Sequence, residues 1–268
     1  MTGGLAARIR GRVRQMFRGP PPRLFSGSHA RWADALQASG GYSATAILDK
    51  ARAATRKVVS GEAAFERDTV LFSEPKADEA KLGGLRRAAS AGGGRLSVVD
   101  FGGALGSAYH QNRRYLDLPG GLRWSVVEQA HFVRCGQQEF QTDELRFYDS
   151  LQDCVDLERP NVALLSGVLS YLELPLELLR QVAQYRVPFV LIDRTATSSD
   201  GKTRLTVQNV APEIYDASYP CWIFDRQAIV DAMGSGYELF EDFESGLDAA
   251  VGCDWGRVSF RGMFFRLL

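Results

Sequence analysis

The residues best placed to bind a ligand follow an apolar run within residues 95–109, RLSVVDFGGALGSAY. The acid that ends the run and three glycines form the pattern D-x-G-G-x-x-G, made of Asp100, Gly102, Gly103 and Gly106. Glycines after a strand let the backbone approach a ligand closely, and the N-terminus of the next helix favours polar or anionic groups. The pattern indicates a nucleotide-like cofactor, although a tight turn without a ligand would need the same glycines.

Two further acids are predicted to end neighbouring strands. Glu128, followed by Gln129, ends the run WSVVE, and Asp149 follows LRFY. An acid about 20 residues beyond a glycine turn can accept both ribose hydroxyls of NAD or of S-adenosylmethionine, and Asp149 is expected near the adenine. The alternative is that these carboxylates lie in solvent-exposed loops.

Two familiar nucleotide motifs do not fit. In the dinucleotide fingerprint G-x-G-x-x-G, matching the last two glycines to Gly103 and Gly106 puts Phe101 at the first position. The segment Gly201-Lys202-Thr203 is not a phosphate loop, because Ala196 stands where that loop needs a glycine. A nicotinamide cofactor is thereby weakened as a prediction, though it is not excluded.

Candidate catalytic residues lie farther along the chain. Asp193 and Arg194 end the run FVLIDR, where Asp193 could remove a proton from an acceptor hydroxyl and Arg194 could bind an anionic group. Tyr219 lies in an aromatic segment that suits a sugar ring, and Tyr171 is a further candidate for the cleft. An Asp–Arg pair that fixes a loop and plain aromatic packing are the alternatives.

The elements that position these residues are short apolar runs alternating with helical stretches from residue 95 onward. This alternation predicts a mostly parallel Rossmann-like α/β sheet with helices on both faces, closed by an antiparallel C-terminal strand. Residues 30–94, including the segment EAAFERDTVLF, are predicted to be a helical extension. Residues 1–29 are predicted to be a basic arm with a proline-rich linker, and residues 95–268 the Rossmann-like domain.

Composition limits the classes of partner. Lys+Arg and Asp+Glu each total 32, so no nucleic-acid partner is predicted. Seven arginines and no acid precede residue 32, and the apolar spacing predicts an amphipathic helix over residues 5–18. That helix is a candidate for peripheral membrane contact, with a solvated tail or a helix packed on a partner as alternatives. Four cysteines without paired spacing and three histidines predict no metal site and a reduced, cytoplasmic protein.

With these strand ends and this acid spacing, the chain resembles the class I S-adenosylmethionine-dependent methyltransferases. It is more closely similar to a family of methyltransferases associated with bacterial surface-polysaccharide genes, through VVDFGGALGSAYHQNRRYL, LLSGVLSYLELP and RLTVQNVAPEIYDASYPCWIF. The resemblance implies that Asp100 and the three glycines line the methionine end of the cofactor and that Glu128 holds the ribose. It also implies that Ser166 and Gly167 close the cleft.

The expected activity is methylation of a hydroxyl on a small molecule or glycan, such as a sugar or polysaccharide precursor, with S-adenosylmethionine as cofactor. A nicotinamide-dependent oxidoreductase is the first rival. A catalytically silent member that serves as a binding or scaffold protein is the second. The sequence makes no prediction of the oligomeric state.

Overall fold

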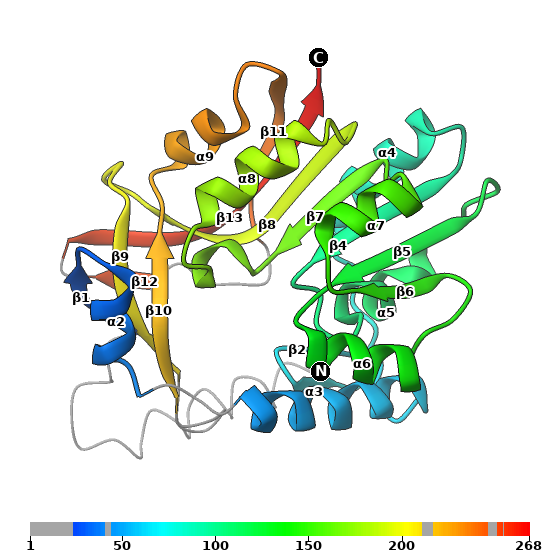
Figure 1. Cartoon of the computed structure of the whole chain (residues 1–268), viewed down its shortest axis with the longest axis horizontal. Helices are drawn as coiled ribbons and strands as arrows, with labels where there is room; N and C mark the ends of the chain where they lie inside the picture. Colours follow the sequence, from blue (N-terminus) through cyan, green and yellow to red (C-terminus); the bar gives the residue numbers. More distant parts are fainter. Residues whose placement is uncertain (1–23, 41–43, 211–216, 246–250, 254) are drawn as a thin grey trace, which may run out of the picture.

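The computed structural model describes residues 24–40, 44–210, 217–245, 251–253 and 255–268 (Figure 1). Its centre is an eight-stranded sheet with the order β11-β13-β8-β7-β4-β5-β6, in which β12 pairs with β13. The strands are β4 (Leu96–Phe101), β5 (Leu122–Val127), β6 (Leu145–Tyr148), β7 (Val162–Ser166), β8 (Phe189–Ser198), β11 (Tyr237–Glu244), β12 (Val251–Cys253) and β13 (Gly256–Leu267).

The direction of the strands confirms the predicted fold class. The five strands β6, β5, β4, β7 and β8 run parallel to one another. Strand β13 is antiparallel to the two strands beside it, β8 and β11. An antiparallel strand beyond the fifth parallel one distinguishes this sheet from the all-parallel dinucleotide fold. The chain order reverses at β4, between β5 and β7, and ligands of open α/β sheets bind outside the carboxyl ends of the strands at such a point.

Helices cover both faces of the sheet because successive strand residues point to opposite faces. Val98 belongs to one hydrophobic core and its neighbour Val99 to the other. The first core lies under α3 (Ala44–Val59), α4 (Glu79–Ala91), α5 (Ser107–Asn112) and α6 (Ala130–Glu139). The second lies under α7 (Leu151–Glu158), α8 (Pro175–Gln184) and α9 (Arg226–Met233). The near-continuous apolar sequences of β4 and β7 follow from burial on both sides.

An accessory sheet, which the sequence pattern does not predict, stands beside the main one (Figure 1). It has the antiparallel order β1-β9-β10, with strands β1 (Phe25–His29), β9 (Arg204–Asn209) and β10 (Ser218–Ile223), and α2 (Trp32–Ala38) packs on it. Residues Phe25–His29 were expected in the linker. Their sequence FSGSH carries no apolar alternation, so only pairing with a distant β9 makes them a strand.

The prediction that residues 62–72 are helical is wrong. Phe65–Arg67 (β2) and Val70–Phe72 (β3) form a hairpin, with the rings of Phe65 and Phe72 stacked at 4.5 Å between centroids. The turn residues Asp68 and Thr69 both have positive φ. Such turns usually carry glycine or asparagine, and without that signal the hairpin is hard to recognise in the sequence.

Two findings concern membranes and metals. Within the described ranges, no helix is long and apolar enough to cross a membrane. The same residues contain no group of three or more His, Cys, Asp or Glu side chains placed to hold a metal ion. The predicted amphipathic helix over residues 5–18 lies outside the described residues, and membrane contact stays a prediction.

Candidate functional site

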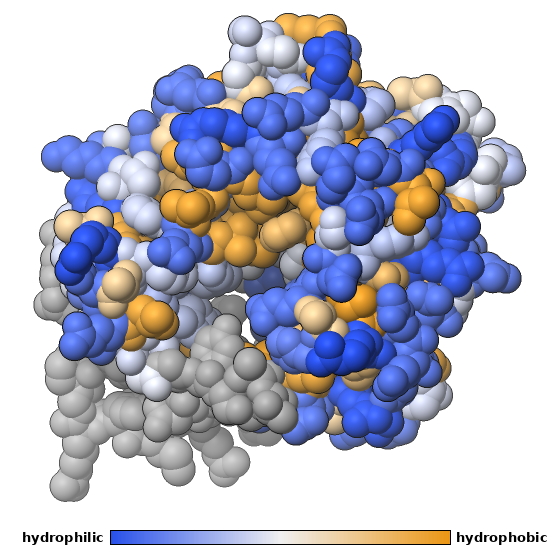
Figure 2. All heavy atoms as spheres, in the orientation of Figure 1, coloured by the Kyte–Doolittle hydropathy of each residue, from blue (hydrophilic) through white to orange (hydrophobic). Residues whose placement is uncertain are grey.

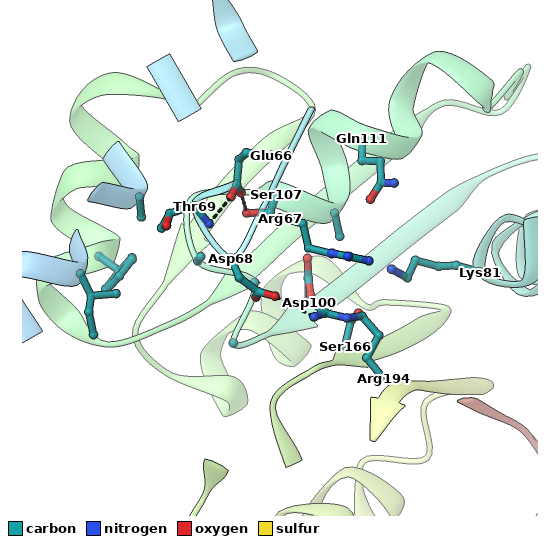
Figure 3. A pocket seen from close by; sticks show the side chains of 17 residues that line it. Glu66, Arg67, Asp68, Thr69, Lys81, Asp100, Ser107, Gln111, Ser166 and Arg194 are labelled. Atoms are coloured by element: carbon teal, nitrogen blue, oxygen red, sulfur yellow. Dashed lines mark hydrogen bonds and ion pairs between the residues drawn. The ribbon is translucent and has the colours of Figure 1, made fainter. Parts of the chain in front are cut away.

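A cavity of about 210 Å³ lies at the carboxyl ends of β4 and β7, where the strand order reverses. The glycine turn, the start of α5, the β2–β3 turn, and side chains from α3 and α4 form its wall (Figure 3). Five predicted site residues line it: Asp100, Gly102, Gly103, Ser166 and Arg194. The other predicted site residues lie outside this lining: Gly106, Glu128, Gln129, Asp149, Gly167, Asp193 and Tyr219.

Two positions of the glycine turn, Gly102 and Gly103, have no room for a side chain. Gly102 has φ +73°, and a Cβ there would lie 2.5 Å from Cγ2 of Val168. A Cβ on Gly103 would lie 2.6 Å from the Asp100 carboxyl group. Gly106, with φ +90°, precedes the first residue of α5. The turn therefore keeps its backbone close to the cavity, as the glycine pattern predicted.

Replacing Gly102 by alanine is expected to distort this turn. The substitution adds about 1–2 kcal/mol of left-handed backbone strain and a further clash with Val168 of about 1–3 kcal/mol. Gly121 is a matched control, because it has φ +87° but nothing within 4 Å of an added Cβ. Urea denaturation should show Gly102→Ala to be less stable than Gly121→Ala, and equal losses would contradict the close packing.

Asp100 is a buried acid under the turn. Its side chain accepts a hydrogen bond of 2.9 Å from Nε1 of Trp124, and the residue is 1% exposed. Burial raises the pKa of Asp100 to about 6, although the hydrogen bond from Trp124 opposes the rise. The carboxylate thus carries its charge at neutral pH at an energetic cost, which a cationic group in the cavity would relieve.

The raised pKa predicts how stability depends on pH. An acid with a higher pKa in the folded state holds its proton where the unfolded chain has lost it, so stability falls as pH rises from about 4 to about 6. A shift of about two pH units corresponds to up to roughly 3 kcal/mol. In urea denaturation, the wild type should lose that much relative to Asp100→Asn between pH 4 and pH 7. A difference between the two proteins that is independent of pH would contradict the assignment.

Glu128 lies beside the turn at the end of β5. Its carboxylate accepts a 2.8 Å hydrogen bond from the amide of Gln129, and it lies close enough to the backbone amide of Ala104, within the glycine turn, for that amide to lower its pKa. Burial raises the pKa of Glu128 above its ordinary value, and these two amides oppose the rise. Gln129 is exposed, as is Asp149 after β6. The structure thus joins Glu128 to the turn but leaves Asp149 at the surface.

Asp193 and Arg194 do not pair with each other, and each has a partner from a distant element. Thr195 and Ile192 pair with Arg261 and Met263, which leaves Asp193 and Arg194 opposite one residue in a β-bulge. Bulges re-aim side chains. The two side chains consequently reach different surroundings.

Asp193 is buried in a charged cluster. It is 1% exposed, its Oδ2 lies 3.1 Å from Nζ of Lys81, and it accepts a 3.2 Å hydrogen bond from Oγ of Ser166. Nζ of Lys81 is also 3.3 Å from Asp78. Burial lowers the pKa of Lys81, but the charges of Asp193 and Asp78 outweigh burial and hold it above its ordinary value. Asp193 is therefore absent from the cavity lining and contacts it through Ser166 and Lys81, which both line the cavity, rather than directly as predicted.

Arg194 faces the mouth of the cavity. It has φ +52°, and its guanidinium forms a 2.7 Å ion pair with Asp68 in the hairpin turn. A Cβ on Gly167 would lie 3.2 Å from that guanidinium, so the glycine leaves room for it. Gly167 thus shapes the mouth by accommodating Arg194.

Several cavity residues were missed in the sequence. Glu66 accepts hydrogen bonds from the Ser107 hydroxyl and from the Thr69 amide, which ties the hairpin to α5. Burial raises the pKa of Glu66, while the Ser107 hydrogen bond opposes it. Arg67 lies over the ring of Phe72 and lines the cavity. The alternation FERDTVLF could have indicated a strand pair, but Lys81 gives no local signal inside its helix.

Tyr219 lies on β10, and its ring meets that of Tyr171 at 5.3 Å between centroids with an edge-to-face angle of 86°. Tyr171 belongs to a short 3-10 helix, η2 (Leu169–Tyr171), that follows β7. The structure therefore brings the two tyrosine candidates together. They meet on the accessory sheet rather than in the cavity.

Comparison with known proteins gives structural likeness only. No model of a known family and no curated protein matches the sequence. The N-terminal domain of EvdMO1, crystallised in the presence of S-adenosylhomocysteine and D-fucose, is 16% identical, with 81% of this chain and 97% of that chain covered and a TM-score of 0.47. An S-adenosylmethionine-dependent methyltransferase from Clostridium acetobutylicum is 8% identical, with 72% and 92% covered and a TM-score of 0.45.

A third solved structure is the 1,6-didemethyltoxoflavin-N1-methyltransferase of Burkholderia thailandensis, with its substrate and S-adenosylhomocysteine bound. It is 16% identical, with 92% of this chain and 96% of that chain covered and a TM-score of 0.43. At these identities and TM-scores the likeness assigns no activity to this chain.

Proposed function

We propose that the chain binds S-adenosylmethionine and transfers its methyl group to a hydroxyl of a small-molecule or glycan acceptor, with a sugar or polysaccharide precursor as the expected class. The observation that carries the cofactor is the placement of Glu128. Its carboxylate lies beside the glycine turn, at the point where the strand order reverses, and the backbone amide of Ala104 in that turn lowers its pKa. An acid in that position can accept both hydroxyls of a ribose.

The residues around the cavity fit the rest of an adenosyl cofactor. Gly102 and Gly103 line the cavity with backbone alone, so the methionine end could approach the chain closely there. Asp100 suits the ammonium group. Arg67 lines the cavity, and its guanidinium is suited to bind the carboxylate of methionine.

When bound, the cofactor would supply a methyl group on a sulfonium, so that an acceptor oxygen could bond to the methyl carbon in line while the carbon–sulfur bond breaks and the neutral thioether leaves. This chain's residues must then place the acceptor and assist its loss of a proton. Ser166 lines the cavity and donates its own hydrogen bond to Asp193. Its oxygen can accept a hydrogen bond from the acceptor hydroxyl. As the oxygen–methyl bond forms, the hydroxyl proton would pass to the Ser166 oxygen and the Ser166 proton to the Asp193 carboxylate. Arg194 positions Asp68 at the mouth.

The proposal is tested by titrating the purified protein with S-adenosylhomocysteine in a calorimeter, with NADH as a parallel titration. The product analogue needs no acceptor. Micromolar binding of S-adenosylhomocysteine alone, lost in Glu128→Ala, supports the proposal. Binding of NADH alone would favour the oxidoreductase, and no binding of either would favour a scaffold protein.

A further inference from the structure

A cluster of neutral polar side chains covers the edge of the accessory sheet nearest η2. Tyr171, Tyr219 and Gln208 form this cluster, which we call the tyrosine wall. Tyr219 on β10 is paired in register with Gln208 on β9, and the Tyr171 hydroxyl donates a 3.1 Å hydrogen bond to Oε1 of Gln208. Within the part of the chain that the structure describes, the Gln208 amide nitrogen has no hydrogen-bond acceptor.

The tyrosine wall adjoins the mouth of the cavity. The segment η2 packs on β10, and Oγ of Ser170 accepts a hydrogen bond from the amide of Ala196, two residues beyond Arg194. Although Tyr171 is 37% exposed, protein groups surround its hydroxyl, and burial raises its pKa well above the ordinary value. The charges of Asp68 and Arg194 act on the same hydroxyl. The Tyr171 hydroxyl of the wall therefore lies close to the Asp68–Arg194 ion pair.

Figure 2 shows the molecule hollowed between the accessory sheet and the main sheet, with apolar side chains along one edge of the hollow. Exposed Leu174 lies three residues beyond η2, at the start of α8.

The charged groups beside the tyrosine wall indicate which class of ligand the wall can bind. The nearby cation, Arg194, is already paired with Asp68 at 2.7 Å, so an anionic group would have to displace a carboxylate. Phenol hydroxyls and an amide both donate and accept hydrogen bonds, and aromatic rings offer flat apolar faces. A neutral ring with hydroxyls around its edge matches both features.

We infer that the tyrosine wall binds the methyl acceptor and that the acceptor presents a neutral hydroxylated ring, such as an uncharged sugar, to it. This inference rests on the proposed function, because the wall is assigned to the acceptor of the same reaction. To the proposed methyl transfer it adds the surface that recognises the acceptor, and it specifies that the ring bound by this surface is uncharged.

Saturation-transfer NMR with S-adenosylhomocysteine present tests the inference. The probes are the methyl glycosides of glucose, galactose and mannose, and their charged counterparts are glucose 1-phosphate and glucuronate. At least one neutral glycoside should receive saturation from the wild type, more strongly than either anion. Tyr171→Ala should weaken that binding about tenfold or more, and Gln208→Ala should weaken it several-fold.

Two controls separate the wall from general effects. Tyr185→Phe removes another tyrosine–glutamine hydrogen bond, in which Nε2 of Gln181 on α8 donates to the Tyr185 hydroxyl at 3.0 Å, and it should leave glycoside binding unchanged. The affinity for S-adenosylhomocysteine should stay within about threefold in every variant, which also reports folding. Glycoside binding that survives both Tyr171→Ala and Gln208→Ala, preference for the anions, or no glycoside binding would each overturn the inference. Failure of S-adenosylhomocysteine to bind the wild type would instead overturn the proposed function, and this inference with it.

Discussion

Lys81→Met is expected to lower the free energy of unfolding by about 3–5 kcal/mol, as measured by urea denaturation at pH 7. The Lys81 side chain is 4% exposed, and its ammonium lies 3.1 Å from the Asp193 carboxylate, which is 2% exposed. Removing the ammonium leaves a buried negative charge without its partner. The desolvation cost of that charge is what makes the loss large.

Two further variants separate this charge effect from lost packing. The double variant Lys81→Met, Asp193→Asn should recover more than half of the loss, because it no longer buries an unpaired charge. Arg87→Met, at a half-exposed position on the same helix, should cost less than about 1 kcal/mol. If the double variant were as unstable as Lys81→Met alone, the ion pair would not be the source of the effect.

Glu128→Ala should weaken S-adenosylhomocysteine binding by about two to four orders of magnitude in calorimetry. The substitution removes the acceptor of two ribose hydroxyls, and hydrogen bonds to a charged group contribute about 1.5–3 kcal/mol each. Burial already raises the pKa of Glu128, so wild-type affinity should begin to fall at a higher pH than for an ordinary glutamate as the solution is acidified.

Asp149→Ala provides the comparison for Glu128. Asp149 also follows a strand of the parallel sheet and, like Glu128, lies outside the cavity lining, but it is exposed, whereas Glu128 is partly buried beside the glycine turn. Its loss should change the affinity less than about tenfold. If both substitutions had equal effects, the ribose position assigned to Glu128 would be wrong.

The parts of the site that the sequence predicts are those encoded within a few residues of one another. The run LSVVDF followed by three glycines specifies β4 and its turn, because burial on both faces and close backbone approach each leave a local pattern. Glu128 could be placed for the same reason, since it ends a recognisable strand at a suitable distance from the turn.

The parts that escaped prediction depend on contacts between distant segments. Lys81 belongs to a helix of small residues, and only the folded chain brings it to Asp193, 112 positions later. Strand β1 exists through its pairing with β9, and the hairpin that carries Asp68 turns without a glycine. Asp68, the ion-pair partner of Arg194, therefore lies in a segment that the sequence predicts to be helical. The predicted contact between Asp193 and the acceptor takes no account of the ion pair between Asp193 and Lys81.

The central claim is that the cavity at the glycine turn holds an adenosyl cofactor, and the crystal structure of the complex with S-adenosylhomocysteine tests it most directly. We expect both ribose hydroxyls on the Glu128 carboxylate and the homocysteine beside Gly102 and Gly103, with the sulfur facing Ser166. Ligand density elsewhere, or none at concentrations far above a measured Kd, would contradict the assignment.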